Sequence, residues 1–119
     1  MGGSLTTHVL DLARGCPAIN VRVELCRLDA TGGGRELLVA TRTNADGRTD
    51  EPLLTGDDFT AGGYELLFDV GEYFARQGTT TAPAFLGQVP VRFSVADPAT
   101  HYHVPLLVTP WGYSTYRGS

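Results

Sequence analysis

The sequence predicts an all-β protein in which two sheets pack face to face as a sandwich. Short apolar segments rich in Val, Leu, Phe and Tyr recur along the chain, separated by Gly, Pro, Asn and Asp. This is the pattern of short strands joined by turns. In the segment 19–28, Val21, Val23 and Leu25 alternate with other residues, as in a strand with one buried face. A chain of 119 residues can bury one core without disulfides or metal, so residues 1–119 are expected to form a single domain.

Each expected strand is an apolar run that ends at turn residues. We expect strands at 5–12, 19–28, 36–43, 48–53, 64–70, 88–95, 101–109 and 113–116. Turns or loops are expected at 13–17, 31–34, 44–47, 96–99 and 110–112, where Gly, Pro, Asn and Asp accept the required backbone conformations. Because Pro90 lacks a backbone N–H, its strand is expected at a sheet edge or beside a bulge.

One segment, residues 71–78, departs from the period of two. Glycines bound it, Glu72 lies near its start and Arg76 near its end, an arrangement that the helix dipole favours. We therefore expect one short α-helix here, followed by a loop at 79–85.

Composition excludes several classes of function. The net charge is -4 and no basic patch is visible, which argues against a nucleic-acid partner. No apolar stretch is long enough to span a membrane, and the first residues lack the features of a signal peptide. Cys16 and Cys26 form neither a CxxC pair nor a disulfide framework, so two free thiols are expected. These observations predict a soluble cytoplasmic protein.

The chain contains three histidines, His8, His101 and His103. Side chains alternate along a strand, so His101 and His103 point to one face, and they line a pocket or simply face solvent. His8 shares a face with Thr6, either as part of the same site or as a lone surface residue. Imidazole exchanges protons near neutral pH, which makes all three candidate catalytic groups.

Two further features point to a polar ligand. Arg48 follows the Asp46–Gly47 turn, where a guanidinium could hold a carboxylate or enolate oxygen or could simply be solvated. The segment 116–119 supplies an aromatic ring, a guanidinium, a flexible glycine and a hydroxyl beside a carboxylate. We interpret Tyr116, Arg117 and Ser119 as ligand-binding residues.

Other chemistries fit the sequence less well. No GxSxG elbow is present, and neither cysteine has a histidine nearby in the sequence. Three histidines could hold zinc, but the carboxylate or cysteine ligands that usually accompany them are missing from the pattern. We therefore expect no metal.

Five motifs occur in order along nearly the whole chain. They are LTTHVLD with GCPA, TNADGR, GEYF, HYHVPLL and GYSTYRGS. Together they resemble the transthyretin-like family, and the final YRGS resembles the signature of its 5-hydroxyisourate hydrolase branch. True transthyretins, which carry thyroid hormone, replace this signature and lack this set of histidines.

The resemblance implies a sandwich of two four-stranded sheets with one short helix, assembled as a homotetramer with sites in a channel between dimers. It implies hydrolysis of 5-hydroxyisourate to 2-oxo-4-hydroxy-4-carboxy-5-ureidoimidazoline, a step from urate toward allantoin, without a cofactor. The residues that match the family's catalytic positions are His8, Arg48, His101 and His103, and those that match its signature are Tyr116, Arg117 and Ser119.

Two alternatives remain at this stage. One is a transthyretin-type module that binds a small aromatic ligand without chemistry, although ionisable groups in the channel suit an apolar hormone poorly. The other is a purely structural β-sandwich, which leaves the polar segment 116–119 unexplained.

Overall fold

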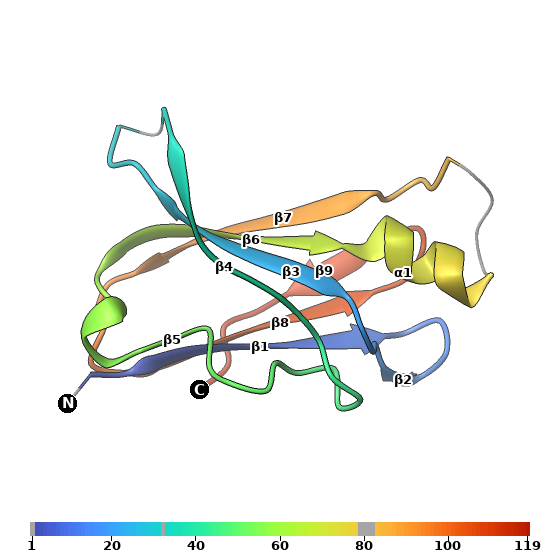
Figure 1. The fold of residues 1–119 in the computed structure, drawn as a ribbon, viewed down its shortest axis with the longest axis horizontal. Helices are drawn as coiled ribbons and strands as arrows, with labels where there is room; N and C mark the ends of the chain where they lie inside the picture. Colours follow the sequence, from blue (N-terminus) through green and yellow to red (C-terminus); the bar gives the residue numbers. More distant parts are fainter. Residues whose placement is uncertain (1, 32, 79–82) are drawn as a thin grey trace.

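The computed structural model describes residues 2–31, 33–78 and 83–119. Two sheets face each other, and a helix lies at one end of the sandwich (Figure 1). The strands are β1 (Ser4–Asp11), β2 (Cys16–Pro17), β3 (Arg22–Leu28), β4 (Arg35–Arg42), β5 (Leu54–Thr55), β6 (Gly62–Asp69), β7 (Gln88–Val95), β8 (His101–Val108) and β9 (Tyr113–Thr115). A 3₁₀ turn, η1, covers Gly56–Asp58, and the helix α1 covers Val70–Gln77.

The two sheets have different strand orders. The first has the order β2-β1-β8-β9, with β5 also paired to β1, and the second has the order β4-β3-β6-β7. Every pairing is antiparallel except that of β1 with β8, which is parallel. The predicted sandwich is therefore confirmed, with a fifth, two-residue strand added to the first sheet.

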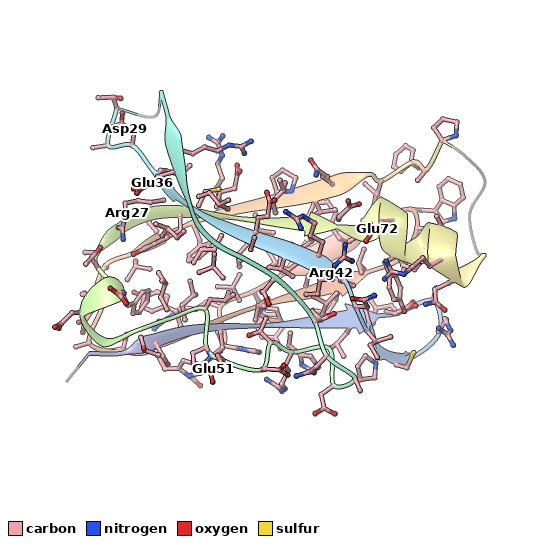
Figure 2. The ribbon with its side chains drawn as sticks, viewed as in Figure 1. Arg27, Asp29, Glu36, Arg42, Glu51 and Glu72 are labelled. Atoms are coloured by element: carbon pink, nitrogen blue, oxygen red, sulfur yellow. The ribbon has the colours of Figure 1, made fainter. Side chains whose placement is uncertain are left out.

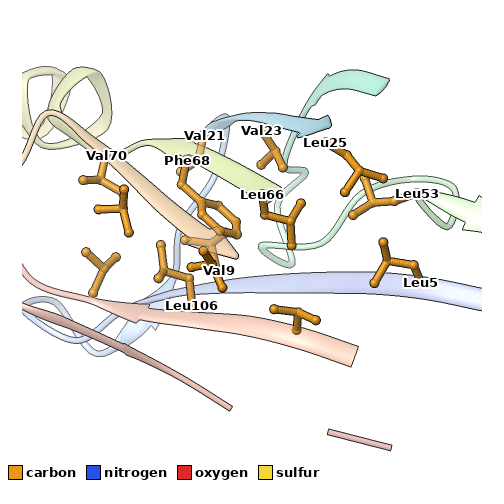
Figure 3. Close-up of a cluster of buried hydrophobic side chains, with 14 of the residues drawn as sticks. Leu5, Val9, Val21, Val23, Leu25, Leu53, Leu66, Phe68, Val70 and Leu106 are labelled. Atoms are coloured by element: carbon orange, nitrogen blue, oxygen red, sulfur yellow. The ribbon is translucent and has the colours of Figure 1, made fainter. Parts of the chain in front are cut away.

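The core fills the space between the sheets (Figure 3). Along β1 every second residue is buried, so Leu5 and Val9 point inward while Thr6 and His8 point to the outer face. Burying a large apolar side chain stabilises the fold by about 1.5–3 kcal/mol. This energy fixes the register of β1, because a slip by one residue would turn its polar face inward. The histidine-bearing face is thus set by the core behind it.

Two of the expected strands differ from those in the structure by more than two residues, and a two-residue strand, β2, falls in the turn expected at 13–17. The expected strand at 48–53 is wrong. The Arg48 backbone forms one isolated β-bridge with His8, and the next strand is the two-residue β5. Pro52 lacks an N–H for pairing at this point. The strand expected from residue 19 begins later, at Arg22, because Asn20 adopts a positive φ of 63°, which ends regular pairing there.

The expected helix is confirmed, shifted by one residue. The Asp69 side chain accepts a hydrogen bond from the Glu72 backbone N–H at its start, and Gly78 ends it in the left-handed conformation. Glu72 also accepts hydrogen bonds from Arg42 and Arg76, each 2.8 Å long (Figure 2). Of the loop expected next, residues 79–82 lie outside the described part of the chain.

The helix is fastened to the far end of β1. Tyr73 and Asp11 are both fully buried, and the tyrosine hydroxyl donates a 2.7 Å hydrogen bond to the Asp11 carboxylate. Asp11 also accepts hydrogen bonds from the backbone N–H groups of Ala13 and Arg14, which shapes the turn after β1. Among the described residues, no helix has the length and apolar character needed to cross a membrane.

Candidate active site

The outer face of β1 and β8 carries all three histidines. In their parallel register, Thr6 lies beside His103 and His8 lies beside Pro105. Since alternate residues share a face, the histidines of β8 meet Thr6 and His8 of β1 on the side away from the core. Residues almost a whole chain apart are brought together by this one pairing.

Thr6 links two of the imidazole rings directly. Its Oγ1 lies 2.8 Å from Nε2 of His101 and 2.8 Å from Nδ1 of His103. The ring centres of His101 and His103 are 6.2 Å apart, and those of His8 and His103 are 6.5 Å apart. His103 is therefore the middle member of a row of three imidazoles.

A tight turn brings Arg48 to the same face. The Asn44 side chain accepts hydrogen bonds from the backbone N–H groups of Asp46 and Arg48. The backbone of Arg48 also forms an isolated antiparallel β-bridge with His8. Gly47 has a φ of +75°, and a Cβ there would lie 2.5 Å from the Val9 carbonyl oxygen. Only glycine allows the turn to approach β1 this closely.

The last residues reach the face from the other side. After β9 the chain returns along β8, and Gly118 pairs with His103, its N–H donating to the His103 carbonyl at 2.7 Å. The end of the chain therefore continues the line of β9 along the edge of the first sheet, beside β8. Ser119 is thereby placed next to the histidines.

Most of these groups line a hollow of about 390 Å³, and His8 lies next to His103 without lining it. It is lined by Thr6, Thr7, Arg48, Thr49, Asp50, Glu51, Pro52, His101, His103 and Ser119. Asp50 and Glu51 were not among the predicted site residues, because the sequence pattern placed them within a strand. Figure 2 shows Glu51 beside β1, on the segment that follows the Arg48 turn. Their position directly after Arg48 was the signal available for finding them.

Two of the histidines are held in the neutral form. Partial burial, and next the positive charge of Arg48, lower the pKa of His8, while Asp46 acts in the opposite direction. Burial, Arg48 and the two other histidines lower the pKa of His103. Both pKa values lie below the ordinary value of about 6.5, so both rings are neutral at pH 7 and can accept a proton.

The Nε2 atom of His8 is buried and has no hydrogen-bond partner among the described residues. A buried polar atom without a partner costs about 1–3 kcal/mol, so its retention calls for an explanation. A site that binds a polar molecule beside this ring would supply one.

Tyr116 and Arg117 lie elsewhere in the chain's own fold. The Arg117 guanidinium stands 4.0 Å from the centre of the Tyr102 ring, and Tyr102 is a buried residue on the core side of β8. Both Tyr116 and Arg117 border a separate hollow that includes Tyr102 and Val104. Within one chain, the structure therefore brings together His8, Arg48, His101, His103 and Ser119, and leaves Tyr116 and Arg117 outside.

The geometry around the histidines does not form a metal-binding cluster. In the part of the chain that the structure describes, no group of three or more His, Cys, Asp or Glu side chains is arranged to hold a metal ion. The hollow instead combines the neutral imidazole of His103 with a guanidinium and a hydroxyl, which suits proton transfer and the binding of an anionic or carbonyl oxygen.

Comparison with known proteins agrees with this arrangement. Residues 5–118 match the HIUase/Transthyretin family. A curated relative from Mesorhizobium japonicum, named 5-hydroxyisourate hydrolase, is 57% identical over 99% of this chain and 94% of its own length.

Solved structures show the same fold. A crystal structure of (S)-allantoin synthase superimposes with a TM-score of 0.92 at 50% identity, covering 99% of this chain but only 44% of that longer one. Sea bream transthyretin in complex with thyroxine gives a TM-score of 0.86 at 30% identity, covering 97% of this chain and 94% of that one. The resemblance stated from the sequence is confirmed: the chain belongs to the HIUase/Transthyretin family, and within it to the enzymes.

Proposed function

We propose that this protein hydrolyses 5-hydroxyisourate in the hollow between Arg48, Ser119 and the histidines. The observation that carries the proposal is the convergence of two neutral imidazoles, His8 and His103, with the Arg48 guanidinium on one face. The name of the Mesorhizobium relative supports the same substrate.

Ring opening needs a water molecule made nucleophilic beside a ring carbonyl. We assign the removal of the water proton to His103, aided by His8, because both are neutral and can act as general bases. The hydroxide adds to the carbonyl carbon, the C–N bond of the ring breaks, and the proton held by the imidazole passes to the departing nitrogen. General base catalysis contributes about 10²- to 10⁴-fold.

Negative charge collects on the carbonyl oxygen as water adds. Arg48 lines the hollow and carries a fixed positive charge with planar N–H donors. Donors that are already in place stabilise such an oxyanion without reorganisation, and losing one costs about 10²- to 10³-fold in turnover. We assign this role to Arg48, and the orientation of the substrate's polar edge to Ser119.

We further propose a homotetramer in which a neighbouring subunit supplies Tyr116 and Arg117 to the site. Two observations support it: these residues lie outside the histidine hollow of their own chain, and β9, which precedes them, is an edge strand of the first sheet. Tyr113 and Trp111 beside that edge are exposed. The two free cysteines, Cys16 and Cys26, support the cytoplasmic location expected from the sequence.

The alternative is a module that binds an aromatic ligand without chemistry. The likeness to a transthyretin crystallised with thyroxine favours it. The hollow opposes it, because guanidinium, carboxylate and imidazole groups line much of its wall. These groups would have to give up water to an apolar ligand without hydrogen bonds in return.

The deciding experiment follows the ultraviolet absorbance of freshly generated 5-hydroxyisourate with and without the protein. We expect rapid decay with the wild type and a loss of most turnover in His103→Asn and Arg48→Ala, while size-exclusion chromatography shows an unchanged assembly. Unaltered rates in both variants would refute the proposal. Absence of any acceleration, together with tight binding of an aromatic ligand, would favour the binding module.

A further inference from the structure

The Thr6 hydroxyl occupies an unusual position between two imidazoles. Its oxygen is 2.8 Å from a nitrogen of each ring, Nε2 of His101 and Nδ1 of His103. A hydroxyl has one proton to donate, and it can also accept. Thr6 can therefore donate to only one of the two rings, and when it does so it accepts from the other, which makes the proton positions on the two histidines complementary.

Two arrangements place the Thr6 proton between the rings. In the first, Nδ1 of His103 carries a proton and donates it to Thr6, while Thr6 donates to Nε2 of His101; the lone pair of His103 is then on Nε2. In the second, Thr6 donates to Nδ1 of His103, so a neutral His103 must carry its proton on Nε2. Only the first leaves His103 with a free basic nitrogen, because Nδ1 is occupied by Thr6 in both.

The charges around the hollow favour the first arrangement. The groups that face His103 are Arg48 and His8 from the turn and β1, His101 from its own strand and Ser119, with Asp50 and Glu51 at the rim. Arg48 is the cation that acts most strongly on the ring. A lone pair on the nitrogen away from Thr6 is attracted to this cation, whereas an N–H there is repelled.

We propose that Thr6 is a positioning residue that fixes the tautomer of His103, accepting a hydrogen bond from Nδ1–H and donating one to His101, so that Nε2 is held ready as the base. The assignment rests on the proposed function of His103. It also gives His101 a distinct role: exposed at the end of the row, it supplies the acceptor that keeps the Thr6 proton away from His103.

Thr6→Val and Thr6→Ser form a matched pair for testing this assignment. Val has nearly the shape of Thr without the hydroxyl, and Ser keeps the hydroxyl. We expect Thr6→Val to lower kcat about 10- to 100-fold with little change in KM. This is the range found for hydrogen-bond partners that orient metal-bound histidines. Thr6→Ser should recover most of this loss. A Thr6→Val enzyme with wild-type kcat, or equal losses in both variants, would overturn the proposal.

A double-mutant cycle tests the part played by His101. If His101 acts through Thr6, His101→Phe lowers kcat alone but adds little in the Thr6→Val background. Fully additive losses would contradict a shared role.

A readout independent of activity is long-range ¹H–¹⁵N correlation of the wild-type imidazoles above pH 7. We expect the proton of neutral His103 on Nδ1, and a shift of the population toward Nε2–H in His101→Phe. A wild-type His103 with its proton on Nε2 would overturn the assignment. If instead the tautomer is as expected and 5-hydroxyisourate is not hydrolysed, the proposed function fails while the placement of the proton stands.

Discussion

Gly118 lies directly against the imidazole of His103. The two residues exchange backbone hydrogen bonds, at 2.7 Å and 3.3 Å, and a Cβ placed on Gly118 would come within 3.1 Å of the His103 Cδ2 atom. The glycine in the segment 116–119 is therefore explained by its neighbour on β8. Without a side chain at Gly118, residues 116–119 lie against the imidazole of His103, and Ser119 reaches the hollow.

Replacing Gly118 with alanine should disturb the site more than the fold. The added methyl group must displace either the tail or the ring, and overpacking of this kind costs about 1–3 kcal/mol. We expect kcat/KM to fall roughly 5- to 160-fold by the conversion of that energy. Gly112→Ala is the control, because a Cβ there meets nothing within 4 Å. Equal activity in the two variants would contradict this account.

Gly47→Ala should destabilise the protein and displace Arg48. Gly47 and Gly15 have nearly the same φ, 75° and 72°, but only at Gly47 would a Cβ strike backbone, 2.5 Å from the Val9 oxygen. Left-handed backbone alone costs about 1–2 kcal/mol in alanine. Urea unfolding should show a loss of this size for Gly15→Ala and a larger one for Gly47→Ala, with turnover reduced only in the latter. Equal losses would show that the close approach does not matter.

The acid limit of activity should lie below pH 6.5. Burial and Arg48 lower the pKa of His8 and His103, so these rings stay neutral to a lower pH than a free imidazole with a pKa of about 6.5. As the pH falls below 6.5, these histidines take up protons in the unfolded chain before they do so in the folded protein. The free energy of unfolding therefore decreases between pH 6.5 and the folded pKa values of His8 and His103. Nuclear magnetic resonance titration of the ring protons measures both pKa values.

Arg48→Gln should raise the pKa values of His8 and His103 toward 6.5. Neither value should reach 6.5, because burial is the larger cause of both shifts and remains in the variant. Arg22→Gln is the matched control, because it makes the same substitution at an arginine that pairs with Glu24. The Arg22 charge is not a cause of either pKa shift. A titration in which Arg48→Gln leaves both rings unchanged would rule out the electrostatic role of Arg48.

Tyr73→Phe should cost stability and spare activity. The variant leaves an oxygen of the fully buried Asp11 without its 2.7 Å partner, a loss of about 1–3 kcal/mol. Burial and Asp11 raise the pKa of Tyr73 to about 12, so the hydroxyl keeps its proton at any working pH. Tyr113→Phe removes a hydroxyl from an exposed ring and should unfold like the wild type in urea. An unchanged free energy of unfolding for Tyr73→Phe would contradict the role of this hydrogen bond.

Subunit complementation tests the shared site. His103→Asn and Arg117→Ala are each expected to be inactive. Mixed and refolded together, they should regain activity if one chain's histidines meet another chain's Arg117, because some sites then contain both native residues. If mixing restores nothing while mixed oligomers are shown to form, the site belongs to one chain.

The sequence pattern was most informative about which side chains share a face of a strand, and least informative about which strands pair with each other. Alternation correctly placed Thr6 and His8 on one side of β1, and His101 and His103 on one side of β8, because a period of two needs only local information. That β1 and β8 pair in parallel depends on energies spread over both sheets. No spacing along the chain encodes it, and the sequence pattern did not predict it.

The errors of the sequence analysis lie where short polar segments depend on tertiary contacts. The strand expected at 48–53 failed because this stretch follows the surface of β1 through single contacts, such as the Leu53 N–H to the Leu5 carbonyl. The direction of the Arg117 side chain was equally hidden. It is decided by where Gly118 pairs with His103, which sends the preceding side chain toward Tyr102.

The parallel pairing of β1 with β8 also bears on how the protein comes into being. Thr6 and His103 are 97 positions apart, so the face that carries the histidines cannot assemble on a ribosome until residue 103 has been translated. Contacts this distant in sequence also slow folding. A polypeptide that terminates before β8 therefore lacks the paired strands that bring Thr6, His101 and His103 together.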